Sequence, residues 1–388
     1  MNNVYEPLIN DEFTGQPPTK RLLAYLLSKK EKGAKIAGFY CGYAPVELIR
    51  AMGLVPAGLC AYSNATIEAA ETVLPANLCP LIKSSYGFIL KDTCPFFGIS
   101  DAVIAETTCD GKKKMFELIA DKRPMFVMDL PQLPDEPEAV DNWTVMIRKL
   151  QRFLEETFNT TADDDTIEAA IKDTNRKSRL MNRVFDYSAL QPPLIGWKEM
   201  YDIFFLAQSA SGAELEPLIE DVLAKLEERK RAGYVHGETG APRVMVSGCP
   251  IAGDSAKVLS IIEEAGGVVV ALDACSGMKC FMDTIEENTG DPLRAIAARY
   301  MRIPCSCMTP NNRRLKLMDR MIERFRPDAV IDVVLHACHS YNVESYRAGM
   351  NVQKKHGLPF LKIVTDYSDG DAGQVRTRIE AILETCHQ

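Results

Sequence analysis

Apolar residues follow two alternating patterns along the first third of the chain. Short runs of consecutive apolar residues are typical of strands buried on both faces of a parallel sheet, and they occupy residues 35–40, 54–59, 101–106 and 124–130. Between them, apolar residues at helical spacing predict helices over residues 18–32, 44–52 and 113–120. Strands alternating with helices in this way predict a parallel sheet with crossover helices.

The same order of elements returns after Pro242. Strands are predicted at residues 243–247, 267–272, 328–334 and 359–366, with a helix over residues 256–265. The sequence Asp-Ala-Val-Ile that begins at Asp328 repeats the one that begins at Asp101. We therefore expect an α/β protein with two pseudo-equivalent, doubly wound parallel-sheet domains of the Rossmann or flavodoxin-like type.

The stretch between the two repeats has a mainly helical pattern. Apolar residues at helical spacing predict helices over residues 142–157, 165–190, 197–209 and 214–231. A chain of 388 residues is also too long for one ordinary core. We predict an N-terminal α/β domain over residues 1–135, a helical linker or lid over 136–240, and a C-terminal α/β domain over 241–388.

Composition narrows the class of partner. With 46% hydrophobic and 25% charged residues, the chain has the composition of a globular protein, and no apolar run approaches the length of a membrane span. Residues 1–20 lack the order of a secretory signal, so we expect a cytoplasmic location. A net charge of −8 argues against a nucleic acid as the main partner. The one basic run, Lys112 to Lys114, is interpreted as a solvated helix face.

Twelve cysteines in a reducing compartment indicate metal or redox chemistry, because stable disulfides are rare there. The chain has no Cys-x-x-Cys pair and no bacterial ferredoxin run, which excludes the usual zinc, thioredoxin, haem and local cluster motifs. A site must therefore be assembled from cysteines distant in sequence. Four of them follow predicted strands, where the loops of a parallel sheet form the binding crevice: Cys41, Cys109, Cys249 and Cys338.

The other cysteines divide by context. Three are interpreted as small buried hydrophobic residues: Cys60, Cys94 and Cys386. Five more lie in turn-rich segments next to strands or helices and join the ligand candidates: Cys79, Cys275, Cys280, Cys305 and Cys307. Proline and glycine beside these thiols shape loops whose N–H groups can hydrogen-bond cluster sulfurs.

Eight segments together resemble the 2-hydroxyacyl-CoA dehydratase and benzoyl-CoA reductase superfamily, and within it most closely the double-cubane cluster proteins. They are Tyr40-Cys-Gly-Tyr-Ala-Pro-Val-Glu-Leu-Ile49, Leu78-Cys-Pro80, Thr108-Cys-Asp-Gly111, Gly248-Cys-Pro250, Cys275-Ser-Gly277, Ile303-Pro-Cys-Ser-Cys-Met308, His336-Ala-Cys-His339 and Gln374-Val-Arg-Thr-Arg-Ile-Glu380. Their order and spacing cover nearly the whole chain.

The resemblance implies a ligand set. Cys79, Cys109 and Cys338 match the cysteines that hold a four-iron cluster in the dehydratase subunits. Cys41 and Cys275, with one of Cys305 and Cys307, would hold a second cubane joined to the first by a sulfide, giving an [8Fe-9S] double cubane. Cys249 and Cys280 are reserve ligands.

The resemblance also implies a function. A separate ATP-hydrolysing iron–sulfur activator would deliver low-potential electrons, and the protein, as a homodimer, would use them to reduce a small unsaturated molecule. The chain has no phosphate-binding Gly-x-x-x-x-Gly-Lys-Ser/Thr loop of its own. His336, His339 and Glu47 are candidate proton donors. Two alternatives remain: a 2-hydroxyacyl-CoA dehydratase subunit with a single [4Fe-4S] cluster, and a non-catalytic electron carrier.

Overall fold

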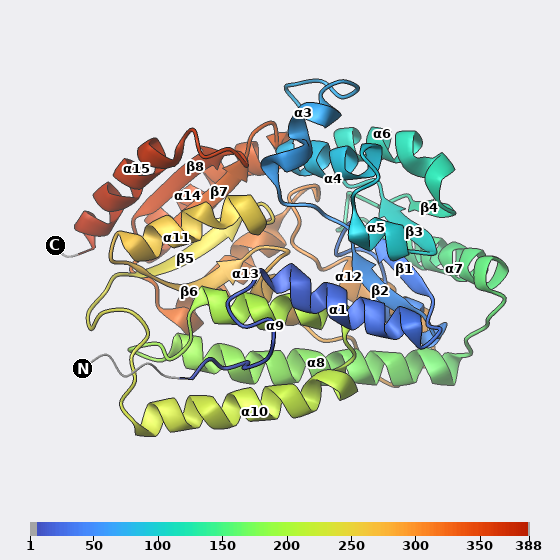
Figure 1. The fold of residues 1–388 in the computed structure, drawn as a ribbon, viewed down its shortest axis with the longest axis horizontal. Coiled ribbons are helices and arrows are strands. Elements are labelled where there is room, and N and C mark those ends of the chain that lie inside the picture. Colours follow the sequence, from blue (N-terminus) through green and yellow to red (C-terminus); the bar gives the residue numbers. More distant parts are fainter. Residues whose placement is uncertain (1–5, 387–388) are drawn as a thin grey trace.

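Two parallel sheets with the same strand order organise the computed structural model, which describes residues 6–386. The first sheet has the order β2 (Val55–Gly58), β1 (Ile36–Phe39), β3 (Ala102–Glu106), β4 (Met125–Met128). The second has the order β6 (Val268–Asp273), β5 (Arg243–Gly248), β7 (Ala329–Leu335), β8 (Phe360–Thr365). All pairs are parallel. The predicted α/β class with two pseudo-equivalent sheets is confirmed (Figure 1).

Continuous apolar runs form these strands because both faces of each sheet are covered. Every residue of β3, β5, β6 and β7 is buried. Around the first sheet lie α2 (Val46–Ala51), α3 (Ile67–Ala70), α4 (Pro80–Leu90), α5 (Pro95–Ile99) and α6 (Asp110–Ile119). Around the second lie α11 (Lys257–Glu264), α13 (Asn312–Phe325), α14 (His339–His356) and α15 (Ala372–Thr385). We call these two halves the N-terminal and C-terminal lobes.

The four helices predicted between the repeats are present as α7 (Ala139–Phe158), α8 (Asp164–Ala189), α9 (Trp197–Ser209) and α10 (Gly212–Arg231). Helix α8 packs against α10, and the N-terminal helix α1 (Pro18–Glu31) packs against α9. In Figure 1, α8, α9 and α10 lie together beneath both lobes, so they form a shared base. Among the described helices, none is long and apolar enough to cross a membrane.

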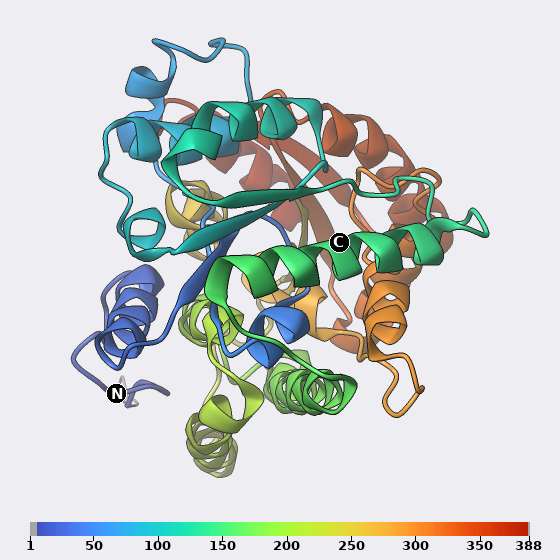
Figure 2. The same ribbon diagram turned by 90° about the vertical axis from the view of Figure 1, so that its right-hand side faces the viewer.

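One segment of the C-terminal half packs onto the N-terminal lobe. Helix α12 (Pro292–Tyr300) lies against α7, as Figure 2 shows for the orange and green helices. Its Ile296, with Ile303 in the following loop, shares a buried cluster with Trp143 of α7. This crossing brings the loop with Cys305 and Cys307 to the first sheet. The domain boundaries at 135 and 240 stay a prediction, and packing crosses them.

Candidate iron–sulfur site

The carboxyl ends of the strands in both sheets lead into one central region. Cys41 follows β1, Cys109 follows β3, Cys249 follows β5, Cys275 follows β6 and Cys338 follows β7. In each sheet, the chain continues from one inner strand toward one edge of the sheet and from the other inner strand toward the opposite edge. Ligands of open parallel α/β sheets bind beyond the carboxyl ends of these two strands, where the direction changes. The fold therefore brings thiols from both halves of the sequence to the carboxyl ends of the strands.

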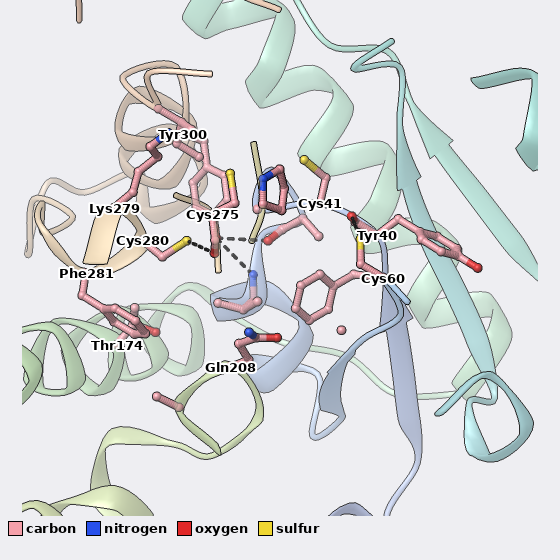
Figure 3. Close-up of a pocket in the computed structure, with 18 of the residues that line it drawn as sticks. Tyr40, Cys41, Cys60, Thr174, Gln208, Cys275, Lys279, Cys280, Phe281 and Tyr300 are labelled. Atoms are coloured by element: carbon pink, nitrogen blue, oxygen red, sulfur yellow. Dashed lines mark hydrogen bonds between the residues drawn. The ribbon is translucent and has the colours of Figure 1, made fainter. Parts of the chain in front are cut away.

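A cavity of about 220 Å³ is lined by four cysteines, of which Cys41 and Cys275 follow strands. Its lining combines the loops after β1, β2 and β6 with side chains of α8 and α9. Figure 3 shows Cys41 and Cys60 facing Cys275 and Cys280, with Thr174 of α8 and Gln208 of α9 at the base. The cavity thus touches both lobes and the helical base.

Three of the cysteines are N-caps of helices of ten residues or more. Cys79 precedes α4, Cys109 precedes α6 and Cys338 precedes α14. Burial raises the pKa of Cys79 to about 12 and also raises the pKa of Cys109, whereas the neighbouring Cys249 thiol lowers the pKa of Cys338. The positive end of a helix stabilises an anionic thiolate. A helix N-terminus thus adjoins each of the three residues predicted to hold the first cluster, while burial opposes the thiolate form at Cys79 and Cys109.

The same three thiols lie close enough together to affect each other's charge. Cys338 contributes to the raised pKa of both Cys79 and Cys109, after burial, which is the largest cause in each case. Cys109 in turn contributes to the raised pKa of Cys79. One thiol from the C-terminal lobe thus neighbours two from the N-terminal lobe.

A second group of thiols lies beside the first. Burial, followed by smaller effects from Cys305 and Cys275 among its neighbours, raises the pKa of Cys41 well above the usual range. Burial also raises the pKa of Cys275 to about 12, with Cys305 among the lesser causes. Cys305 additionally acts on Cys109 and Cys338, so it lies between the two groups.

Two pairs of neighbouring thiols each share a proton, which shifts the pKa values of their two members in opposite directions. A hydrogen bond from Cys307 lowers the pKa of Cys305 to about 6, and that shared proton raises the pKa of Cys307. A hydrogen bond from Cys249 likewise lowers the pKa of Cys338, and burial together with that bond raises the pKa of Cys249. Proton sharing within each pair thus favours the thiolate form at Cys305 and at Cys338.

Four other thiols have hydrogen bonds of their own. Cys60 donates to the Tyr40 carbonyl at 3.0 Å, and Cys280 donates to the Cys275 carbonyl at 3.3 Å. Cys94 accepts a hydrogen bond from the Phe97 N–H at 3.3 Å. Cys386 lies near the end of α15, next to the Ile382 carbonyl.

Buried cations surround the thiols. Lys112 is 9% exposed and donates to the Tyr40 carbonyl at 2.9 Å, so the interpretation of Lys112 to Lys114 as a solvated face is wrong for its first residue. Lys279 pairs with Asp273 at 3.2 Å, and Arg314 pairs with Asp332 at 2.7 Å. These three side chains are almost wholly buried. A buried positive charge needs a negative partner.

The three predicted proton donors lie in different places. Glu47 is 2% exposed, lines the cavity and accepts a hydrogen bond from the Tyr300 hydroxyl at 2.8 Å. His336 and His339 are exposed next to Cys338 and do not line the cavity. Of the three, Glu47 is therefore the one that faces the enclosed space.

The donor set is rich in thiols, which are the ligands that iron–sulfur clusters use. Within residues 6–386, no group of three or more His, Cys, Asp or Glu side chains closes around one metal ion. A cubane distributes its thiolate ligands over separate irons, so its ligands need not meet at one point. The buried cations beside the two groups of thiols have the charge that would balance such an anionic cluster.

Sequence reasoning missed four buried charged groups of the site. Glu106, at the end of β3, has both carboxylate oxygens buried and unpaired within the described residues, and burial raises its pKa to about 8 against the attraction of Lys112. Lys279, Arg314 and Lys177 are also buried. The available signal was a charged residue within an otherwise apolar strand or helix face, as at Glu106.

Comparisons with known proteins agree with this arrangement. The sequence profile of the family described as 2-hydroxyglutaryl-CoA dehydratase, D-component, matches residues 41–386. The chain is 39% identical over 383 residues to an Escherichia coli (strain K12) protein named "Putative dehydratase subunit YjiM", covering 97% of this chain and 98% of the relative. It is 22% identical to (R)-2-hydroxyglutaryl-CoA dehydratase, subunit beta, of Acidaminococcus fermentans, covering 93% and 94%.

A further relative is one of the subunits of the benzoyl-CoA reductase of Thauera aromatica, which is 21% identical over 69% of this chain and 68% of the relative. The dehydratase and reductase names among these relatives confirm the superfamily inferred from the eight segments. Because the profile spans almost the whole fold, from the loop after β1 to the end of α15, the chain belongs to the 2-hydroxyglutaryl-CoA dehydratase D-component family.

Proposed function

We propose that this protein is the iron–sulfur component of a reductive enzyme and that it holds two linked cubanes between its lobes. One observation carries the proposal: thiols from both halves of the chain form two neighbouring groups, with Cys305 acting on members of both. A single cubane would leave one of these groups of thiols without iron to bind. Two cubanes joined by a sulfide would use both.

The first group, Cys79, Cys109 and Cys338, would hold one cubane. The second would consist of Cys41, Cys275 and Cys305. Between Cys305 and Cys307, the alternative left open by the sequence, the lowered pKa of Cys305 supports Cys305, because a thiolate is the ligand form and Cys307 supplies the hydrogen bond. Cys249 and Cys280 each donate to a neighbouring acceptor, which supports leaving both outside the ligand set.

When bound, the cluster would supply low-potential electrons to a molecule in the adjoining cavity. Lys112, Lys279 and Arg314 would balance its negative charge from buried positions. Apolar side chains of both lobes line most of the cavity and limit the entry of water. Glu47 faces this space and would supply or accept protons there.

The size of the cavity supports a small substrate. At about 220 Å³, it is smaller than the roughly 300–1,000 Å³ of typical drug-sized sites. It could hold a small unsaturated molecule, or only the acyl end of a CoA thioester. Relatives are named as subunits, which supports a multi-component system, here with an ATP-hydrolysing activator as electron donor and a second copy of the chain.

A second candidate is a 2-hydroxyacyl-CoA dehydratase subunit with one [4Fe-4S] cluster. The names of the relatives favour it. It would use the first group of thiols and leave Cys41, Cys275 and Cys305 without iron.

Iron and sulfide analysis of anaerobically purified protein distinguishes the two. A double cubane gives about eight irons per chain and a single cubane about four. We expect Cys275→Ser to lose about half of the iron or all of it. The matched control is Cys60→Ser, which alters a thiol of the same cavity that donates to a carbonyl, and it should keep its iron. Equal iron content in Cys275→Ser and the wild type would contradict the proposal.

A further inference from the structure

The wall of the cavity that belongs to the helical base carries several polar side chains. Helix α8 contributes Thr174, Lys177 and Ser178, and α9 contributes Gln208. The Thr174 hydroxyl oxygen is buried and has no hydrogen-bond partner in the described part of the chain. Figure 3 shows Thr174 and Gln208 below the thiols. A mostly apolar cavity with a few polar groups on one wall is typical of a site that orients a small molecule.

Lys177 is the charged residue of this wall. It is 5% exposed, and its Nζ donates to the carbonyl of Ala207 at 2.9 Å and to that of Ala210 at 3.3 Å, both at the C-terminal end of α9. An ammonium group has three N–H donors. Two are taken by the carbonyls, which leaves one donor on a residue that lines the cavity.

The charges around Lys177 come from three elements. Helix α2 contributes Arg50 and Glu47, α8 contributes Asp173, and the turn after β6 contributes Cys280. From α9, the two carbonyls and the neutral Gln208 face the same region. Burial and, to a lesser extent, Arg50 lower the pKa of Lys177 to about 7, against the opposing effects of Glu47, Asp173 and Cys280. The amine can therefore lose and regain a proton near neutral pH.

We propose that Lys177 is a proton donor to a small, uncharged molecule whose multiple bond ends in a nitrogen or oxygen lone pair, and that Thr174 and Gln208 hold this molecule by hydrogen bonds. This inference rests on the proposed function, which it extends by naming the substrate class and the acid. A general acid must lie within hydrogen-bond reach of the atom that it protonates. Lys177 meets this condition for the polar end of a molecule whose other end faces the thiols.

The proton and electron count is simple. Reduction of one multiple bond by one order takes two electrons and two protons. The electrons come from the low-potential donor protein of the proposed function. For one of the protons, an N–H bond of the Lys177 ammonium breaks and an N–H or O–H bond forms on the substrate; the second proton comes from water. The neutral amine then regains its proton from water.

Carbamylation by potassium cyanate tests the position of the amine without any turnover. Cyanate is small enough for the cavity and reacts with neutral amines, and mass spectrometry identifies the modified lysine. The reference is N-α-acetyl-lysine in the same tube, because a free lysine amine has a pKa of about 10.4. The rate for Lys177 relative to this reference should fall about tenfold between pH 6 and pH 8, since an amine that titrates near 7 gains little neutral form above that pH.

Competition tests the ligand class. Acetonitrile and propyne have nearly the same linear shape, but only acetonitrile ends in a nitrogen lone pair. We expect acetonitrile to slow the carbamylation of Lys177 in the holoprotein several-fold more than propyne at equal concentration. Equal protection by the two, or a Lys177 that stays unmodified at pH 8, would overturn the inference.

Two variants connect the residue to turnover with activator, ATP and reductant. Lys177→Met removes the acid and should lower the rate by about a hundredfold or more. In the wild type, the rate should fall above pH 7 as the Lys177 amine loses its proton. Lys177→Arg keeps the charge and can still donate to both carbonyls, but the guanidinium does not release its proton near pH 7. This variant should therefore lose most of the rate and should not show the fall above pH 7. Iron content should match the wild type in both.

The matched control is Lys257→Arg. Lys257 is a mostly buried lysine that donates to the Ser368 carbonyl and to Asp371 at 2.5 Å, and it does not line the cavity. Its rate and pH profile should equal those of the wild type. If the wild type itself shows no turnover with any small molecule, the proposed function fails. If the wild type turns over and Lys177→Arg keeps its rate and pH profile, only the inference about Lys177 fails.

Discussion

Glu106 should make the stability of the protein fall as pH rises, and Glu106→Gln should remove that dependence. The side chain is 0% exposed, both carboxylate oxygens are unpaired within the described residues, and burial raises the pKa to about 8 from 4.5. A pKa that is higher in the folded state stabilises the fold below pH 4.5, and this contribution is lost as pH rises through 8.

The size of the effect follows from the shift. Each pKa unit corresponds to about 1.4 kcal/mol, so the shift of Glu106 corresponds to about 5 kcal/mol. About 3 to 4 kcal/mol of this is lost between pH 5 and pH 8. The neighbouring thiols and Lys112 also titrate, but they are present in wild type and variant alike. The difference between the two proteins therefore isolates Glu106.

Urea unfolding of the metal-free, reduced protein at pH 5, 6.5 and 8 measures this difference. The stability of the wild type relative to Glu106→Gln should fall across the series by about 3 to 4 kcal/mol. Glu136→Gln, which changes an exposed glutamate before α7, should keep the wild-type pH dependence. If Glu106→Gln and the wild type have parallel stability curves from pH 5 to pH 8, the reasoning about the buried carboxyl is wrong.

Two further predictions concern the core and the buried charges. Trp143→Ala removes a wholly buried side chain that joins α7 to α12 and should lower the free energy of unfolding by about 3–5 kcal/mol. The control, Val145→Ala, changes a residue that is 51% exposed and should alter that free energy by less than about 0.5 kcal/mol. Similar losses in the two variants would contradict the packing of Trp143 between the helices. Arg314→Met leaves Asp332 buried without its partner at 2.7 Å and should cost about 3–5 kcal/mol. Adding Asp332→Asn should recover part of that loss in the same urea titration, and strict additivity would count against a coupled pair.

The sheets could be predicted because buried parallel strands are continuous apolar runs. The strand predicted at residues 243–247 is β5, and the strand predicted at 267–272 is β6, each shifted by about one residue. The four helices between the two repeats were found for a similar reason, since each has an apolar stripe at helical spacing. Local pattern was sufficient for these elements.

The environment of individual lysines could not be read in the same way. A helix turns about 100° per residue, so in the run Lys112 to Lys114 only Lys112 points inward to the Tyr40 carbonyl. Lys177 lies on α8 among polar residues, and its burial depends on α9, which packs over it. Both outcomes are set by tertiary contacts rather than by neighbours in sequence.

The candidate site was predictable in part. The position of a cysteine after a strand follows from the sequence, because parallel strands share one carboxyl edge. The neighbourhood of Cys305 with Cys41 and Cys275 does not follow, since it requires the segment around α12 to cross to the first sheet. The choice between Cys305 and Cys307 depends on which thiol donates, a property of the folded loop.

Anomalous diffraction at the iron absorption edge, on crystals of anaerobically purified protein, tests the central claim most directly. We predict two adjacent groups of iron between the lobes, one bounded by Cys79, Cys109 and Cys338 and the other by Cys41, Cys275 and Cys305. Iron confined to the first group would support the single-cubane dehydratase subunit instead. The absence of any iron signal among these thiols would contradict the account.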